Sequence, residues 1–267
     1  MMHQHILETK HIISGYNGKT IVNDVNISLP DGKITVIIGA NACGKSTLLK
    51  TVARLLKPLS GEILLEGTKI HQIPPKQLAR KLGLLPQSPI VPEGITVADL
   101  VARGRYPYQG LFRGLKSDDY DAVTEALNRM GIADIADSSV DELSGGQRQR
   151  VWIAMTLAQE TDILLLDEPT TYLDITHQIE ILDLLMDLNQ RKGTTIAMVL
   201  HDINLSARYA DHIIAMKTGR VVAEGSPVEV LNESLIKEVF GLDCTVISDP
   251  VSKTPMIIPM GRHHCNL

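Results

Sequence analysis

Short apolar runs recur along the whole chain, and several are rich in β-branched residues and bounded by Gly, Pro or Asp. Such runs predict strands. We expect strands over Ile6–Ile13, Ile21–Leu29, Ile34–Ile38, Ile63–Leu65, Leu82–Leu85, Ile163–Leu166, Thr194–Leu200, His212–Met216 and Val221–Ala223. Apolar residues at helical spacing predict helices between the later runs. These helices cover Leu48–Leu56, Tyr120–Met130, Gln147–Ala158, Thr176–Gln190 and Ile203–Tyr209.

The order of these elements indicates an α/β fold. Strands and helices alternate from Ile34 onward, which predicts a mainly parallel central sheet. The earlier strands have no helices between them, so we expect an antiparallel β piece beside the main sheet. Residues 88–160 contain helical patterns but no convincing strand, which predicts an inserted helical subdomain. We expect one domain over residues 1–267, with the insert at approximately 88–160 and a C-terminal extension at approximately 225–267.

The segment GANACGKST connects a predicted strand to a predicted helix. Such a loop turns backbone N–H groups around a β-phosphate, and the N-terminus of the following helix favours the same negative charge. Lys45 can reach the β- and γ-phosphates, and the Ser46 hydroxyl can bind Mg²⁺. A chance Gly/Lys turn would account for neither flanking element. The loop therefore predicts a nucleoside triphosphate site made of Gly39, Ala40, Asn41, Ala42, Cys43, Gly44, Lys45, Ser46 and Thr47.

A second candidate is the acidic end of the apolar run Ile163–Leu166. Ligands bind at the carboxyl ends of strands in open α/β sheets. Asp167 is therefore placed to hold Mg²⁺, and Glu168 to orient and deprotonate the attacking water. A strand that ends in solvated acids is the alternative, and the phosphate loop favours the functional interpretation. The long separation from Ser46, without an Asn-Lys-x-Asp motif after Asp167, argues against a small GTPase.

A third motif indicates a particular family. Leu143, Ser144, Gly145, Gly146 and Gln147 open the predicted helix that ends at Ala158. Two glycines allow close approach of backbone N–H groups, and a serine adds a hydroxyl at the helix N-terminus, so this is another candidate anion site. The LSGGQ sequence is the signature of ABC ATPases, and the chain resembles that family over nearly its whole length. The resemblance implies a P-loop NTPase core and an ATPase activity.

Other family positions can be matched individually. The resemblance implies that Tyr16 stacks on adenine, although a turn tyrosine is the alternative. Gln87 matches the glutamine that senses Mg²⁺ and the attacking water, and Asp174 matches the aspartate of the loop that crosses to the partner subunit. His201 matches the histidine that contacts the γ-phosphate. The implied catalytic residues are Glu168, His201 and Gln87, and the implied metal-binding residues are Ser46, Gln87 and Asp167.

The phosphate loop departs from the commonest family form at Ala40 and Ala42, where proline and glycine are usual. Ala42 should reduce the freedom of the loop, because glycine tolerates a positive φ more readily. Cys43 in the same loop is either sensitive to oxidation or simply a small residue that fits. Three cysteines at unpatterned spacing favour a reduced cytoplasmic setting. The His263, His264 and Cys265 tail is either a metal site or an ordinary solvated end.

The resemblance also implies partners. Two copies would pack head to tail, with each ATP between Lys45 of one copy and Ser144 of the other. No apolar run is long enough to span a bilayer, so the pore would be separate permease subunits, with this chain peripheral on the cytoplasmic face of the membrane. The formal net charge of −5 does not indicate a nucleic-acid surface.

Two segments are similar to ATPases of ferric-siderophore importers: Gly104–Phe112 and the tail from Val239 to Pro259. This similarity implies an indirect link to a siderophore-binding protein. Generic insert and tail sequences, a cobalamin or haem importer, and a non-transport ABC ATPase are the alternatives. The aromatic residues within Tyr106–Phe112 predict a loop that docks on the permease, or one that folds onto its own subdomain.

Overall fold

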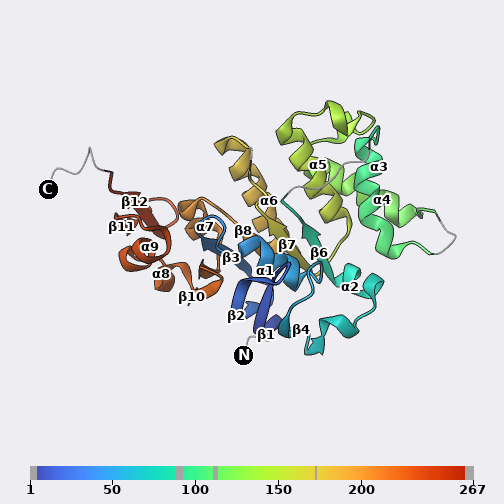
Figure 1. Cartoon of the computed structure of the whole chain (residues 1–267). Coiled ribbons are helices and arrows are strands. Elements are labelled where there is room, and N and C mark those ends of the chain that lie inside the picture. The colour runs from blue at the N-terminus through green and yellow to red at the C-terminus, as the bar shows by residue number, and fades with distance from the viewer. Residues whose placement is uncertain (1–4, 88–92, 111–113, 172, 262–267) are drawn as a thin grey trace. The chain divides into compact units, whose positions relative to one another are not determined.

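A computed structural model describes residues 5–87, 93–110, 114–171 and 173–261 (Figure 1). The chain forms two compact units. The first unit comprises Met1–Ile70 and Ala197–Leu267, and the second comprises His71–Ile196. The boundary at Ile196 falls inside strand β8 (Thr195–Val199). No helix in the described ranges is long and apolar enough to cross a bilayer.

The first unit contains an antiparallel sheet with the strand order β2-β1-β4-β5. Its strands are β1 (His5–Tyr16), β2 (Lys19–Pro30), β4 (Ser60–Leu65) and β5 (Thr68–Lys69). Alternate residues of β2 are buried, as expected for a sheet with one face on the core. The predicted antiparallel piece is confirmed.

Four strands of a second, six-stranded sheet lie wholly or largely in the first unit and follow one another in the order β10-β9-β3-β8. Its strands β3 (Ile34–Gly39) and β9 (His212–Lys217) pair in parallel, and β10 (Arg220–Gly225) pairs antiparallel with β9. Every residue of β3 is buried, which explains why its sequence is apolar except at Thr35. Helices of the unit are α1 (Lys45–Val52), α7 (Ile203–Tyr209), α8 (Pro227–Val230) and α9 (Glu233–Phe240).

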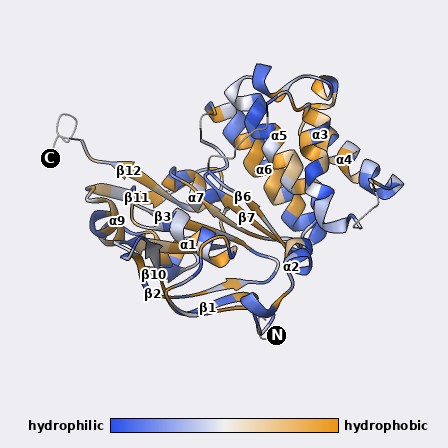
Figure 2. Cartoon of the chain, turned by 45° about the vertical axis from the view of Figure 1, so that its right-hand side comes forward, coloured by the Kyte–Doolittle hydropathy of each residue, from blue (hydrophilic) through white to orange (hydrophobic). Residues whose placement is uncertain are grey.

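The second unit combines parallel strands with helices. Strands β6 (Leu82–Leu85) and β7 (Ile163–Asp167) pair in parallel. The helices are α2 (Pro75–Lys81), α3 (Val97–Ala102), α4 (Ser117–Arg129), α5 (Gly145–Ala158) and α6 (Ile175–Lys192). Helices α3, α4 and α5 contact one another, and Figure 2 shows hydrophobic stretches in orange on them. Their buried apolar residues include Leu100, Leu127 and Ile153. The boundaries expected for the insert and the C-terminal extension stay predictions.

The segment expected as an aromatic docking loop is largely ordered structure. Residues Arg103–Tyr108 form a 3₁₀ helix, η2, whereas Leu111 and Phe112 lie outside the described residues. The Tyr108 hydroxyl donates to the Gln159 carbonyl over 3.0 Å. The guanidinium of Arg105 lies 4.0 Å from the centre of the Tyr108 ring. Tyr108 therefore folds onto its own unit, and Tyr106, with 64% of its surface exposed, is the described tyrosine of this segment that faces solvent.

A buried ion pair explains why η2 is held in place. Arg105 Nε donates to Asp119 Oδ1 over 2.8 Å, and both side chains are nearly fully buried. Asp119 Oδ2 also accepts from the Lys116 backbone N–H at the start of α4. That backbone hydrogen bond, followed by the Arg105 contact, lowers the pKa of Asp119 despite burial. A buried pair with its remaining lone pairs satisfied fixes η2 against α4.

The C-terminal hairpin is fastened to α7 in the first unit. Strands β11 (Cys244–Ser248) and β12 (Pro255–Pro259) form the hairpin (Figure 1). Asn204 on α7 exchanges two hydrogen bonds with the backbone of Ile257. Arg208 Nη2 donates to the buried Asp249 Oδ2 over 2.6 Å, and this contact, with the Val251 backbone N–H, lowers the pKa of Asp249. The sequence pattern did not predict this hairpin.

Asp249→Asn is expected to lower Tm at pH 7, because the amide cannot form the ion pair with Arg208. The pKa of Asp249 is lower in the folded than in the unfolded chain, so the pair stabilises the fold above the unfolded pKa of about 4. This contribution begins to decrease as the pH falls below that value, and it is lost fully only when the pH falls through the lower pKa of the folded chain. Thermal unfolding between pH 3 and pH 8 should give a Tm difference that is largest near neutrality and shrinks in acid.

The control is Asp243→Asn, which removes an exposed ion pair with Lys237. It should change Tm little at any pH. A constant Tm difference for Asp249→Asn across the pH range would show that the charge of Asp249 is not what stabilises the hairpin.

Candidate functional site

The predicted phosphate loop joins β3 to α1 in the first unit. Its backbone enters the left-handed region at Gly39, Ala42 and Gly44, with φ of 152°, 61° and 107°. A Cβ on Gly39 would lie 2.3 Å from the Met216 carbonyl oxygen, so only glycine fits there. Ala42 adopts this conformation at a cost of about 1–2 kcal/mol relative to a right-handed residue. The expectation that Ala42 restricts the loop is consistent with this geometry.

Lys45, the first residue of α1, has its ammonium group folded onto the loop. Its Nζ donates to the Gly39 carbonyl over 2.8 Å and to the Ala40 carbonyl over 3.0 Å. The side chain is 5% exposed. A buried cation that donates to two carbonyl oxygens is poised to exchange them for phosphate oxygens.

The N-terminus of α1 also fits an anion. Its N-cap residue is Gly44, which provides no side-chain oxygen to the first N–H groups of the helix. These groups point out of the helix end and carry its positive partial charge. Together with Lys45 and the glycine cradle, they make the loop a fitting site for the phosphates of a nucleotide.

The structure places the two other site residues of the first unit at the ends of strands. Tyr16 is the last residue of β1, and 42% of its surface is exposed. His201 is exposed and follows β8, which neighbours β3 in the sheet. Asp202 caps α7 directly after it, with Oδ1 accepting from the Leu205 N–H. Their roles toward the adenine and the γ-phosphate stay predictions.

The second unit brings Gln87 and Glu168 together. Strands β6 and β7 pair in parallel, with Leu85 opposite Leu166. Gln87 and Glu168 each follow two residues after this pair, so they lie next to each other. Gln87 Nε2 donates to Glu168 Oε2 over 2.7 Å. Asp167, the last residue of β7, is 1% exposed. Gln87 and Glu168 therefore lie together, directly after Asp167, and their roles toward Mg²⁺ and the attacking water stay predictions.

Glu168 itself has an unusual backbone. Its φ is 57°, in the left-handed region that a glutamate rarely adopts, and such strain concentrates at functional sites. The Thr171 hydroxyl donates to the same Oε2 over 3.1 Å. Sequence reasoning missed Thr171, although a hydroxyl three residues after the acid was a visible signal. An amide and a hydroxyl therefore fix the orientation of this carboxylate.

The signature segment forms the start of α5. Ser144 is the N-cap, with Oγ accepting from the Gln147 N–H over 3.2 Å, and Gln147 Oε1 accepts from the Ser144 N–H over 3.1 Å. This reciprocal pair is a capping box, which explains the Ser-x-x-Gln spacing. Leu143 is half-buried, and the segment from Ser144 to Gln147 is mostly exposed. A Cβ on Gly145 would meet no neighbour within 4 Å, so the segment is accessible to a ligand.

Asp174 starts the next helix. Its Oδ1 accepts from the His177 backbone N–H over 2.9 Å, and that bond lowers the pKa of Asp174. His177 Nδ1 also lies 2.8 Å from the same oxygen. Asp174 is thus the N-cap of α6 and is exposed, and its contact with a partner subunit stays a prediction.

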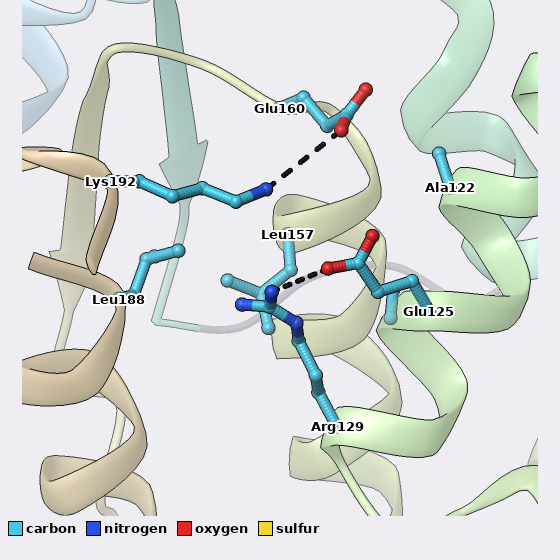
Figure 3. A pocket seen from close by; sticks show the side chains of 8 residues that line it. Ala122, Glu125, Arg129, Leu157, Glu160, Leu188 and Lys192 are labelled. Carbon is cyan, nitrogen blue, oxygen red and sulfur yellow. Dashed lines mark hydrogen bonds and ion pairs between the residues drawn. The ribbon is translucent and has the colours of Figure 1, made fainter.

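Figure 3 shows a pocket among α4, α5 and α6 of the second unit. Leu157 and Leu188 line it, together with the ion pair Arg129–Glu125 within α4 and the ion pair between Lys192 of α6 and Glu160. Its volume of about 20 Å³ holds roughly one water molecule. It is too small for a nucleotide, and none of the residues predicted to act on a nucleotide lines it.

The described residues include no cluster of three or more His, Cys, Asp or Glu side chains that could hold a metal. Mg²⁺ is commonly bound by one or two protein carboxylates or hydroxyls together with substrate phosphates. A carboxylate such as that of Asp167 and a hydroxyl such as that of Ser46 are ligands of this kind, and their role toward Mg²⁺ stays a prediction. The tail residues His263, His264 and Cys265 lie outside the described residues.

Comparison with known proteins identifies relatives along nearly the whole chain. Residues 22–171 match the family described as "ABC transporter". The chain is 54% identical to "Probable siderophore transport system ATP-binding protein YusV" of Bacillus subtilis, over 97% of this chain and 94% of that protein. It is 52% identical to "Ferric enterobactin transport ATP-binding protein FepC" of Escherichia coli, over 96% of this chain and 94% of that protein.

Solved structures agree with this assignment. An inward-facing transporter described as metal-chelate type superposes with a TM-score of 0.83 at 27% identity, over 97% of this chain and 98% of that chain. The dimeric ATP-binding cassette MJ0796, in a post-hydrolysis state with ADP and Pi, superposes with a TM-score of 0.74 at 29% identity, over 82% and 98%. The expected fold, a P-loop NTPase core with a mainly parallel sheet, is confirmed.

Lys45→Ala is expected to weaken ATP binding about 10- to 100-fold, because a charge-assisted hydrogen bond to phosphate contributes about 1.5–3 kcal/mol. Isothermal titration with ATP measures the change. Lys50→Ala, which removes a charge from the last turn of the same helix, is the control and should keep wild-type affinity. Equal ATP affinities for Lys45→Ala and wild type would contradict the prediction that this loop binds the phosphates.

Proposed function

The chain belongs to the ABC transporter ATP-binding family, and we propose that it hydrolyses ATP to power import of a ferric siderophore through a separate membrane permease. The identity of the cargo is inferred from one observation. The chain is more than 50% identical, over nearly the full length of both chains, to proteins named for siderophore and ferric enterobactin transport. The geometry of the Glu168 carboxylate supports the hydrolytic part.

In the proposed reaction, the first unit binds the phosphates. Lys45 exchanges the carbonyls of Gly39 and Ala40 for β- and γ-phosphate oxygens, and the N–H groups at the start of α1 donate to the same phosphates. Tyr16 stacks on the adenine with its exposed ring, and His201 contacts the γ-phosphate. Ser46, Asp167 and Gln87 hold Mg²⁺, whose charge stabilises the phosphates in the transition state.

Glu168 is the proposed general base. Its carboxylate accepts a proton from the water that attacks the γ-phosphorus, and ADP leaves with the β-phosphate oxygen carrying the charge. Gln87 and Thr171 both donate to Oε2, so the carboxylate is held in one orientation before the water arrives. Holding the base in place lowers the entropy cost of the reaction.

We also propose a dimer in which each ATP lies between the phosphate loop of one copy and the signature segment of the other. The exposed start of α5, with its open Gly145, supports a ligand supplied by another subunit. A two-fold dimer would use this arrangement twice. Crosslinking of Ser144 to Lys45 within one chain, in place of crosslinking between chains, would refute it.

The proposed site of action is the cytoplasmic face of the membrane, where the chain binds permease subunits and is linked indirectly to a siderophore-binding protein. Tyr106 is the exposed aromatic residue of η2, and Lys76 lies 5.1 Å from the centre of its ring. Among the described residues of the predicted docking segment, Tyr106 is therefore the aromatic residue that suits a permease contact.

Deletion of the gene is expected to abolish growth on a ferric siderophore as sole iron source, and the wild-type chain should restore it. Glu168→Gln should fail to restore it, because an amide cannot take the proton, and hydrolysis by the purified variant should fall about 10²–10⁴-fold while ATP still binds. Growth on several defined siderophores, with phosphate release and ATP titration on the pure protein, tests both parts.

The alternatives give different results in the same strain. A requirement for the chain only on haem iron or cobalamin would assign the cargo to that importer class. Normal uptake of every cargo, together with salt-dependent nucleic-acid binding, would favour a non-transport ABC ATPase. Wild-type hydrolysis by Glu168→Gln would overturn the assignment of the base.

A further inference from the structure

The loop between Glu168 and α6 is held by two glutamine side chains from different helices. Gln149 on α5 donates through Nε2 to the Pro169 carbonyl over 2.9 Å. Gln178 on α6 donates through Nε2 to the Leu173 carbonyl over 3.1 Å. Both amides are half-buried, and Pro169 is buried. The backbone on either side of Thr171 is thus fixed by side chains that the proposed reaction does not use.

This loop controls the base directly. Thr171 Oγ1 donates to Glu168 Oε2, and the Thr171 N–H donates to the Glu168 carbonyl over 3.3 Å. The φ of 57° at Glu168 persists only where the surroundings hold it, since a glutamate relaxes toward right-handed or extended backbone. The hydrogen bond from Gln149 acts one residue after Glu168, at the point where relaxation of this strain would begin.

Gln149 also lies close to the signature segment in the same helix. It is two residues beyond Gln147, and a Cβ on Gly146 would lie 3.3 Å from the Leu173 side chain. The first turns of α5 and the loop 169–174 therefore pack together within the second unit. A displacement of the start of α5 would pull on the Pro169 carbonyl through the Gln149 amide.

We propose that Gln149 is a positioning residue for Glu168, which couples the start of α5 to the orientation of the base. The proposal rests on the function proposed above. Gln149 does not touch the nucleotide in this account. It acts by holding the Pro169 carbonyl, which keeps Thr171 and the Glu168 carboxylate in the arrangement that accepts the proton.

The test is Gln149→Leu, which keeps the approximate size of the side chain and removes the donor. We expect kcat for ATP hydrolysis to fall about 10- to 100-fold, because small displacements of a catalytic group have effects of that order. The Kd for ATP should stay within about twofold, since the phosphate-binding residues are unchanged. Gln149→Glu, which also lacks the N–H donor, should behave alike and serves if the leucine variant does not fold.

Gln159→Leu is the matched control. Gln159 caps the other end of α5, and its amide also donates to a backbone carbonyl, that of Ala79. Its loss removes a comparable side chain-to-backbone hydrogen bond without affecting the loop after Glu168. We expect a lower Tm and an unchanged kcat for this variant. An equal loss of kcat in both variants would mean that Gln149 acts only through the stability of α5.

A double mutant separates positioning from an independent effect. In the Glu168→Gln background the group to be positioned is already inactive, so adding Gln149→Leu should cause no further loss of single-turnover hydrolysis. A further 10- to 100-fold loss would overturn the proposal, and so would a wild-type kcat for Gln149→Leu alone. Wild-type hydrolysis by Glu168→Gln would contradict the proposed base itself, which distinguishes failure of the function from failure of this inference.

Discussion

The proposed hydrolysis of ATP depends on how one carboxylate, that of Glu168, is held. Glu168 follows a fully buried strand, takes a left-handed backbone, and receives hydrogen bonds from Gln87 and Thr171 on the same oxygen. A glutamate in this conformation is strained, so the surrounding loop must supply the contacts that keep it there. A base that is fixed before water arrives needs little rearrangement in the transition state, and this preorganisation is what hydrolysis requires.

The fold explains why these groups meet. Parallel pairing of β6 with β7 brings the carboxyl ends of both strands to one sheet edge, where Gln87 and Glu168 lie level. In the first unit, close packing of Gly39 against the backbone of Met216 allows the phosphate loop to turn and place Lys45. Each unit therefore builds its part of the chemistry at the end of buried strands, where backbone geometry is well determined.

Much of this was predictable from the sequence. Apolar runs located the long strands, and the glycine-lysine loop, the acidic strand end and LSGGQ identified the family. Thr171 and Gln149 were harder to find. Their contacts depend on the conformation of the loop after Glu168, and a loop has no hydrophobic periodicity that would predict its conformation. The segment containing Tyr108 was ambiguous for a related reason: its burial depends on Arg105, whose partner Asp119 lies on another helix.

The most direct test of the held carboxylate is single-turnover hydrolysis of bound ATP by Gln87→Leu and Thr171→Val. Each substitution removes one donor to Glu168 Oε2 and leaves the phosphate loop intact. We expect both variants to hydrolyse ATP more slowly than wild type and Thr171→Val to bind ATP with wild-type affinity. Because Gln87 is also proposed to hold Mg²⁺, Thr171→Val is the cleaner of the two. Wild-type single-turnover rates in Thr171→Val would contradict the claim that these contacts prepare the base.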